Sequence, residues 1–354
     1  MTTTTVPPRQ QWQFGRIYPP DEAWLATAEP EPVIEPELPM IDTHHHLWLR
    51  GGHRYLLEEL LADINTGHHN VVATVFEECH SHYRADGPEE MRPIGETEFV
   101  AGIAAMSASG NYNKTRVAAG IVGAADLTLG DRVEPVLLTQ IRAAGGRFRG
   151  VRHSAGYDSD PIIGNSGAAM QPGLYRRPDF RAGLARLTAL GLVFDAWLYH
   201  PQLGDVIALA RAFPASPIVM CHVGGFLGYG PYAGRRDEEF ARWQRSMTEL
   251  AQCPNVVVKL GGMVNRGAAY DFHTAAPPPS SATLADVWRP FVESCIELFG
   301  ADRCMFESNF PVDKMAVGYT ALGNAFKRIT SAASAEEKLA IYSGTAKRVY
   351  RLEW

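Results

Sequence analysis

The chain has 354 residues and a formal net charge of −6, with 46% hydrophobic and 20% charged residues. This composition is ordinary for a soluble globular enzyme. The acidic balance, without a basic stripe to neutralise phosphates, argues against binding to nucleic acid or to an anionic membrane surface. No segment reaches the roughly 18 apolar residues of a membrane span. Five cysteines without a CxxC pair favour reduced, buried thiols and a cytoplasmic location, and residues 1–8 show no secretory signal pattern.

Residues 1–39 are rich in proline and glutamate, above all between Pro30 and Pro39. We interpret this segment as an arm that lies on the body of the protein or on a neighbouring subunit, which is compatible with a homo-oligomer. Residues 40–354 are predicted to form one domain. The aromatic residues that would anchor the arm are Trp12, Phe14, Tyr18 and Trp24.

Eight short apolar runs follow the arm, and they are rich in β-branched residues. Such runs are typical of strands buried on both faces of a parallel sheet. Segments with helical spacing separate them, and Gly191 and Gly300 follow two of these as helix stops. We therefore predict an α/β fold, a (β/α)8 TIM barrel; a doubly wound open sheet is the alternative, but no G-x-G-x-x-G turn opens the first unit. The runs are 40–48, 70–79, 115–123, 148–153, 192–200, 217–225, 255–263 and 303–312, and the helical segments include 132–144, 179–190, 202–213 and 286–299.

Three polar residues occupy every second position of the first run. Asp42, His44 and His46 would therefore share one face of a strand. Polar side chains are costly to bury without partners, and a metal or a substrate would supply those partners. A histidine-rich loop edge is the alternative reading, and the HxH pattern by itself does not decide between the two.

Polar residues also end most of the other runs. A barrel places its active site at the C-terminal ends of its strands. Five of the twelve histidines end an apolar run. One such histidine is readily explained by ordinary structural bonding, whereas five at the same end of a barrel favour a functional site. The residues concerned are His44, His46, Glu77, Glu78, Arg152, His153, His200, His222, Ser308 and Asn309.

These motifs, in this order, resemble the amidohydrolase superfamily over residues 40 to 350. The branch they resemble is the amidohydrolase-related group that contains 2-pyrone-4,6-dicarboxylate lactonase and the sugar lactonases. The segments that carry the resemblance are Asp42-Thr43-His44-His45-His46, Gly150-Val151-Arg152-His153, the strand-five His200, Cys221-His222-Val223-Gly224-Gly225 and Phe306-Glu307-Ser308-Asn309-Phe310-Pro311-Val312.

The resemblance implies a metal centre. His44, His46 and His200 correspond to metal ligands, and three imidazoles with an oxygen donor suit Zn, Mn or Fe better than Mg or Ca, with Zn the first choice. The strand-six His222 corresponds to a residue that binds metal or acts on the substrate carbonyl. The branch also contains members that work without a metal, and in that version Arg152 would clamp a substrate carboxylate.

The last strand departs from the family pattern. Asn309 stands where the family has an aspartate that takes a proton from the attacking water, and an amide cannot do this near neutral pH. We expect Asn309 only to orient its partners. Glu307, two residues earlier on the same strand face, is our candidate for the missing ligand or base. The alternative is that Glu307 is a structural carboxylate paired with Arg152.

Further residues are expected to bind the substrate. His153, Glu78 and Tyr83 follow strands, and the aromatic, glycine-rich sixth loop with Tyr229 and Arg235 would form a lid or a subunit contact. The seventh insertion adds weaker candidates. These are Asn265, Arg266, Tyr270 and His273.

The function we expect is metal-dependent hydrolysis of a lactone, ester or related carbonyl bond in a small molecule that carries a carboxylate or a ring. One alternative is a metal-dependent decarboxylase or hydratase of an aromatic-derived acid. Another is a barrel that binds a ligand without hydrolysis, which the replacement at Asn309 suggests.

Overall fold

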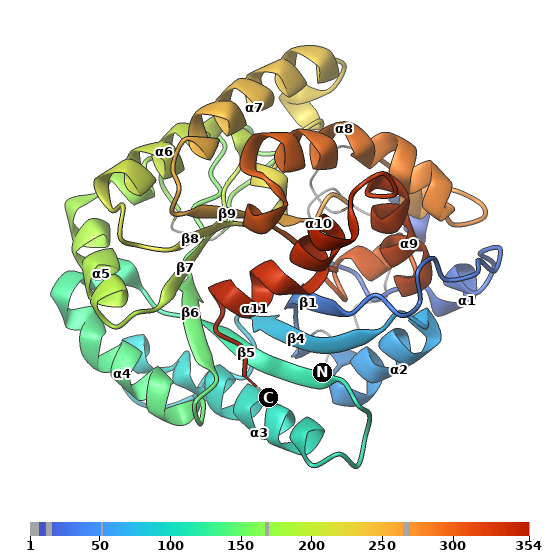
Figure 1. The fold of residues 1–354 in the computed structure, drawn as a ribbon. Coiled ribbons are helices and arrows are strands. Elements are labelled where there is room, and N and C mark those ends of the chain that lie inside the picture. The colour runs from blue at the N-terminus through green and yellow to red at the C-terminus, as the bar shows by residue number, and fades with distance from the viewer. Residues whose placement is uncertain (1–6, 12–15, 51, 167–169, 265–269, 354) are drawn as a thin grey trace.

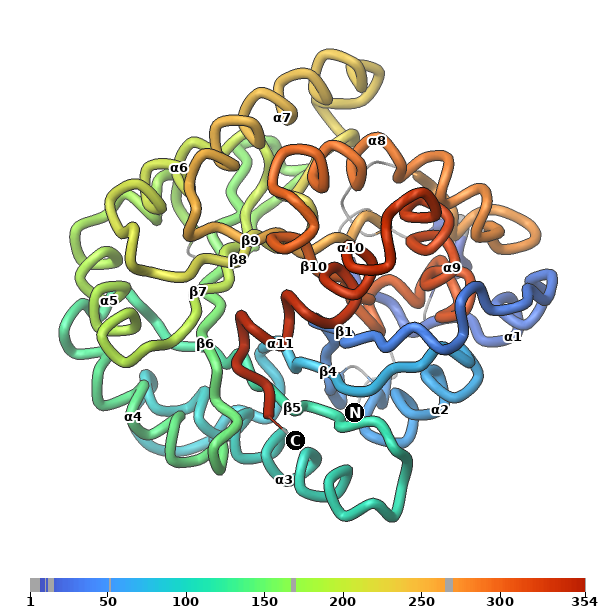
Figure 2. Tube along the Cα trace, in the orientation of Figure 1, coloured from blue at the N-terminus to red at the C-terminus, as the bar shows by residue number. Residues whose placement is uncertain are grey.

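The computed structural model describes residues 7–11, 16–50, 52–166, 170–264 and 270–353. Eight parallel strands pair in the order in which they occur in the chain. They form a ring with the helices outside it (Figures 1 and 2). Each predicted run contains one strand, so the predicted (β/α)8 barrel is confirmed. The strands are β1 (Met40–His45), β4 (Val71–Glu77), β5 (Arg116–Ala124), β6 (Phe148–Arg152), β7 (Val193–Ala196), β8 (Ile218–Met220), β9 (Val256–Leu260) and β10 (Cys304–Phe306).

The ring closes between β1 and the segment that follows β10. A parallel bridge joins His45 to Phe310. The backbone N–H of His46 donates to the Phe310 carbonyl at 2.8 Å, and that of Asn309 donates to the His44 carbonyl at 2.8 Å. The HxH motif and the last-strand motif, which lie at opposite ends of the barrel sequence, are therefore neighbours.

Helices follow the strands and cover the outside of the barrel. Residues that commonly begin helices mark their starts. Pro178 is the first residue of α5, and the Ser280 side chain accepts a hydrogen bond from the Thr283 N–H at the start of α8. Within the described residues, no helix is both long and apolar enough to cross a membrane. The longer helices are α2 (Leu57–Gly67), α3 (Ile94–Ala108), α4 (Glu134–Ala143), α5 (Pro178–Ala189), α6 (Leu203–Ala212), α7 (Arg236–Ala251), α8 (Ser281–Phe299) and α9 (Tyr319–Ile329).

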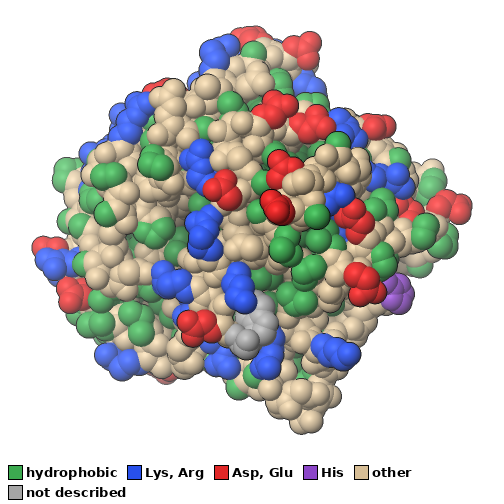
Figure 3. Space-filling view, viewed as in Figure 1, with side chains coloured by type: hydrophobic (Ala, Val, Ile, Leu, Met, Phe, Trp, Pro, Cys, Tyr) green, Lys and Arg blue, Asp and Glu red, His purple; other side chains and the backbone are tan. Residues whose placement is uncertain are grey.

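The C-terminal segment covers the N-terminal end of the barrel. Helices α10 (Ala335–Leu339) and α11 (Thr345–Val349) lie across the near end of the ring in Figure 1. Tyr350 and Leu352 pack against buried strand residues such as Val75. The same face carries acidic and basic side chains side by side (Figure 3). The opposite end of the barrel is left for the site.

The described part of the N-terminal arm lies against the barrel. Trp24, in the short helix α1 (Glu22–Leu25), is only 5% exposed and donates from Nε1 to the Ala275 carbonyl at 2.8 Å. Further along the arm, the carbonyl of Glu35 accepts from Lys327 Nζ at 3.0 Å. Trp12 and Phe14 lie outside the described residues. The division of the chain at residues 39 and 40 stays a prediction.

A buried histidine beside the arm makes stability depend on pH. Burial, with Lys327 at 3.1 Å from Nδ1, lowers the pKa of His69 from 6.5 to about 4. Between these values the unfolded chain binds a proton on His69 and the folded chain does not, so stability is lost as the pH falls. Between pH 7 and pH 4.5, the free energy of unfolding should therefore fall less in His69→Gln than in the native protein, by on the order of 3 kcal/mol. Urea titrations of both proteins at the two pH values measure this difference. An equal fall in both proteins would contradict the prediction.

Candidate active site

The end of β1 carries two buried histidines. The Nε2 atoms of His44 and His46 lie 3.3 Å apart. His46 Nδ1 lies 2.8 Å from the Glu77 carbonyl, which can only accept, so Nδ1 holds the proton and Nε2 keeps its lone pair. Burial lowers the pKa of both rings well below the usual range, and Lys259 adds to this at His44 as Arg152 does at His46. Both imidazoles are neutral near pH 7, which is the form that binds a metal.

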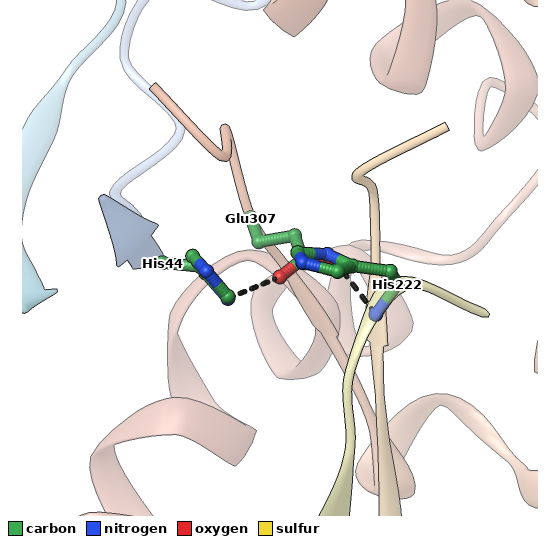
Figure 4. A group of neighbouring side chains, drawn as sticks. All are labelled: His44, His222 and Glu307. Carbon is green, nitrogen blue, oxygen red and sulfur yellow. Dashed lines mark hydrogen bonds and ion pairs between the residues drawn. The ribbon is translucent and has the colours of Figure 1, made fainter. Parts of the chain in front are cut away.

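Glu307 lies between two of the histidines (Figure 4). Its Oε2 is 3.0 Å from His44 Nδ1, and its Oε1 is 2.7 Å from His222 Nδ1. Oε1 also accepts from the His222 backbone N–H at 3.1 Å. The ligating atoms of the three residues lie within 4.8 Å of one another. The carboxylate therefore joins the ends of β1, β8 and β10.

The backbone beside Glu307 is shaped to admit these side chains. Gly261 and Gly262 follow β9, and a Cβ would lie 2.4 Å from Glu307 Cγ at the first and 2.1 Å from His222 Nδ1 at the second. Gly262 also has a φ of +60°. His222 and Val223 themselves have φ values of 54° and 46°, a region that β-branched residues rarely adopt. Only glycine fits at both positions after β9, and the strained turn after β8 aims His222 at Glu307.

Arg152 approaches the histidines from β6. Its Nε donates to Glu78 Oε1 at 2.7 Å, and its Nη1 lies 3.4 Å from His44 Nε2. A second carboxylate, that of Glu77, lies 3.6 Å from Nε. Arg152 is thus paired with the two glutamates that end β4, whereas Glu307 is paired with histidines.

Asp42 holds the last-strand motif in place. Its Oδ1 accepts from the Ser308 N–H at 2.8 Å, and its Oδ2 accepts from the Ser308 hydroxyl at 2.5 Å and from the Tyr319 hydroxyl at 3.1 Å. Burial raises the pKa of Asp42 to about 6. Because Ser308 directly follows Glu307, Asp42 fixes the backbone from which Glu307 projects.

A charged group lies deeper in the barrel, below the histidines. Lys259 Nζ is 2.7 Å from Glu77 Oε2 and 2.8 Å from Asp195 Oδ2. The Tyr350 hydroxyl donates to Asp195 Oδ2 at 2.7 Å. Lys259, Glu77 and Asp195 are fully buried. We did not identify Lys259 from the sequence, although a lysine inside the apolar run of β9 is a signal that could have indicated it.

A cavity of about 200 Å³ opens at this end of the barrel. Of the predicted site residues, His46, Glu78, Arg152, His222 and Asn309 line it. His44 and Glu307 are fully buried behind the lining. Several lining residues, which come from loops, from the short strand β2 (Trp48–Arg50) and from α8, were missing from the sequence-based site. These include Trp48, Arg50, Trp197, Tyr199, Phe226 and Phe291.

The structure does not bring His200 into the histidine group. Its Nε2 is 3.0 Å from Glu239 Oε2, and its Nδ1 accepts from the Leu227 N–H at 3.1 Å, so both ring nitrogens are engaged. The predicted run extended to His200, but β7 ends at Ala196. His200 instead begins the turn that leads into α6, beyond the end of the strand.

His153 is also turned away from the cavity. Its Nδ1 accepts from the Leu127 N–H at 3.2 Å, and its ring packs on Phe180. Asn309 lines the cavity and donates from Nδ2 to Asp313 Oδ1 at 2.8 Å, which is the orienting contact expected of an amide.

The other predicted substrate-binding residues lie outside the cavity lining. Tyr83 places its hydroxyl 3.2 Å from His80 Nδ1, Tyr229 packs beside the Ile163 cluster, and Arg235 pairs with Glu238 at 2.6 Å on the surface. In the seventh insertion, Tyr270 accepts from Arg236, and the Arg9 guanidinium donates to the backbone carbonyl of His273. Asn265 and Arg266 lie outside the described residues.

The donor set fits a divalent metal. Among the described residues, His44 Nδ1 and Glu307 Oε2 are buried polar atoms that lie 3.0 Å from each other but make no hydrogen bond, either with each other or with another group. Such atoms are costly unless a cation or another partner satisfies them. Neutral imidazoles beside a carboxylate are ligands that zinc and similar ions prefer. A divalent metal as the cofactor is therefore supported.

Comparison with known proteins shows the family of the chain. Residues 41–352 match the family model described as amidohydrolase. The chain belongs to this family. The predictions of an amidohydrolase fold and of a hydrolase are thereby confirmed, and the N-terminal arm lies outside the matched residues.

Individual relatives of this amidohydrolase extend along most of the chain. An uncharacterized protein of Sinorhizobium fredii, y4mH, is 31% identical over 335 residues, which are 90% of this chain and 98% of the relative. L-fucono-1,5-lactonase of Burkholderia multivorans is 28% identical over 284 residues, 75% of this chain and 86% of the relative. A solved amidohydrolase from Burkholderia multivorans with bound zinc has a TM-score of 0.66 at 26% identity and covers 89% of this chain and 99% of that one.

Proposed function

We propose that this amidohydrolase opens a lactone, ester or related carbonyl bond of a small ring- or carboxylate-bearing substrate by water attack. The observation that carries the proposal is the convergence of His44, His46, His222 and Glu307 at a cavity on the C-terminal ends of the strands. A relative named as a lactonase supports it.

His44, His46 and Glu307 would hold the metal, with His222 beside them. Glu307 takes the place that the sequence assigned to His200, because both nitrogens of His200 are engaged elsewhere. Zinc is the first candidate for two reasons. Zinc prefers imidazole and carboxylate ligands, and a related amidohydrolase has zinc bound. When bound, the metal would polarise the carbonyl group and lower the pKa of water.

The protein side chains account for binding and proton transfer. Arg152 and His222 line the cavity, so both can reach a substrate there. The water oxygen bonds to the carbonyl carbon, the ring C–O bond breaks, and the product is a hydroxy acid. The proton lost by water passes to the Glu307–His222 pair, and His222 returns a proton to the leaving alkoxide. Arg152 binds a substrate carboxylate through the N–H groups that Glu78 does not use.

Metal removal tests this function. We expect the purified protein to contain stoichiometric metal by mass spectrometry and to hydrolyse members of a lactone panel in a pH-indicator assay. A chelator should abolish turnover, zinc should restore it, and His46→Ala should lose metal, since it removes a ligand with a free lone pair. His68→Asn, at an exposed helix end, is the control.

Three outcomes would contradict parts of the proposal. Full turnover without metal would exclude the metal centre. Release of CO2 from an aromatic acid, with no lactone opened, would favour a decarboxylase. A metal-free protein that binds lactones but never opens them would favour the non-hydrolytic barrel.

A further inference from the structure

The N-terminal arm contributes a side chain to the cavity. Ile17 is among the residues that line it. The family match begins only at residue 41, and β1 begins at Met40. Part of the cavity wall therefore comes from a segment outside the barrel that the family shares.

The arm is fastened next to Ile17. The Tyr18 N–H donates to Met315 Sδ at 3.3 Å, and Glu22 pairs with Lys314 at 2.7 Å. Lys314 is itself held by an ion pair with Asp63 at 2.7 Å. Lys314 and Met315 follow the last-strand motif directly, so the arm is tied to the segment that closes the barrel. These contacts hold Ile17 at the cavity.

Aromatic and apolar side chains form one part of the lining. Trp197, Tyr199 and Phe226 come from the segments after β7 and β8, and Phe291 comes from α8. The polar lining residues His46, Glu78, Arg152 and His222 lie at or just after strand ends. Arg50, His80, Ser154, Ser166 and Asn309 are further polar members of the lining. A many-hydroxylated ring would leave hydroxyl groups unpaired against the apolar part, whereas an apolar substituent would be removed from water there.

Ile17 is suited to cover such a substituent. Its side chain is 38% exposed, so part of its apolar surface still faces water. We infer that Ile17 is a specificity-determining residue and that the substrate is a lactone or ester bearing an apolar alkyl or aryl group. The inference rests on the proposed hydrolysis for its reaction and on the cavity lining for its substrate class.

A pair of lactones that differ by one apolar chain tests this. The probes are δ-valerolactone and δ-decalactone, which is the same ring with a pentyl chain, and glucono-δ-lactone represents hydroxylated rings. We expect the protein to prefer δ-decalactone. Ile17→Ala should lower the ratio of kcat/KM for δ-decalactone over δ-valerolactone about fivefold to tenfold, mainly through KM, because the lost contact is the same in the ground and transition states.

Two further variants separate contact from general damage. Ile17→Leu should restore most of the ratio, since it keeps the apolar volume. Leu339→Ala removes another exposed apolar side chain, at 48% exposure, from α10 at the other end of the barrel and should not change the ratio. A ratio insensitive to Ile17→Ala, or a preference for glucono-δ-lactone in the native protein, would overturn the inference.

Binding separates this inference from the hydrolase proposal. If no lactone is opened, calorimetric titration with intact δ-decalactone still reports on the cavity. Weaker binding to Ile17→Ala would then support the inference although hydrolysis had failed. Absence of both binding and turnover would overturn the inference, and turnover that ignores Ile17 would overturn it while leaving the hydrolase proposal intact.

Discussion

Replacing Glu307 by glutamine is expected to lower turnover at least about 100-fold and to reduce bound metal. The carboxylate lies 3.0 Å from His44 Nδ1 and 2.7 Å from His222 Nδ1. An amide of the same shape has no charge to offer a cation, cannot take a proton near neutral pH, and can place an NH2 group against a ring nitrogen. Steady-state kinetics and metal analysis on the same preparation measure both effects.

Glu239→Gln is the matched control for this variant. Glu239 is also a buried glutamate paired with a histidine, His200 at 3.0 Å, but neither residue lines the cavity. We expect Glu239→Gln to keep its metal and most of its turnover. Unchanged turnover and metal content in Glu307→Gln would exclude Glu307 as ligand or base. If Glu239→Gln lost its metal and Glu307→Gln did not, the result would indicate that His200 binds the metal.

Replacing Lys259 by methionine is expected to lower the free energy of unfolding by about 3–5 kcal/mol near neutral pH. Lys259 is the cation between Glu77 and Asp195, at 2.7 and 2.8 Å. Methionine fills similar space but leaves two buried carboxyl groups facing each other without a cation between them. Burial and the charge of Asp195 already raise the pKa of Glu77, and loss of the lysine should raise it further.

The pH dependence distinguishes this electrostatic effect from poor packing. A carboxyl group whose folded pKa is raised contributes stability below its unfolded pKa of about 4.5, and this is lost as the pH rises through the folded pKa. Because the folded pKa of Glu77 is already about 8 with Lys259 in place, a further rise separates the two proteins only above that value, so the deficit of Lys259→Met should be smaller near pH 7 than near pH 9.5 in urea titrations. A deficit that is the same at both pH values would point to packing instead.

Lys327→Met provides the matched control for Lys259. Lys327 is also a fully buried lysine, but its partners are the neutral Glu35 carbonyl and the His69 ring. Its loss removes hydrogen bonds and leaves no carboxylate pair. We expect a cost of about 1–2 kcal/mol near pH 7, smaller than the cost of Lys259→Met at the same pH.

The barrel was predictable because its signal is local. A strand buried on both faces needs a short apolar run, and this requirement is met within a few neighbouring residues. All eight runs contain a strand, and the polar residues at their ends include His44, His46, Arg152 and His222. The alternation in the HxH segment placed its residues at the C-terminal end of β1, where the barrel closes.

The partners of those residues depend on contacts between distant segments. His200 ended an apolar run like the other histidines, but the strand stops at Ala196 and the chain turns His200 toward Glu239. From the sequence, Glu307 could have faced Arg152 or a metal. Only the structure shows that Arg152, at the end of β6, pairs with Glu78, the residue after β4.

The sequence by itself determined the fold, the family resemblance and the end of the barrel at which the candidate site lies, because periodicity and motif order are properties of short segments. Only the tertiary structure decided which polar groups meet. It placed His200 beside Glu239, joined Glu307 to His44 and His222, buried Lys259 between Glu77 and Asp195, and brought Ile17 from the arm into the cavity wall. Such contacts join residues that are far apart in the chain, so the spacing of neighbouring residues cannot predict them.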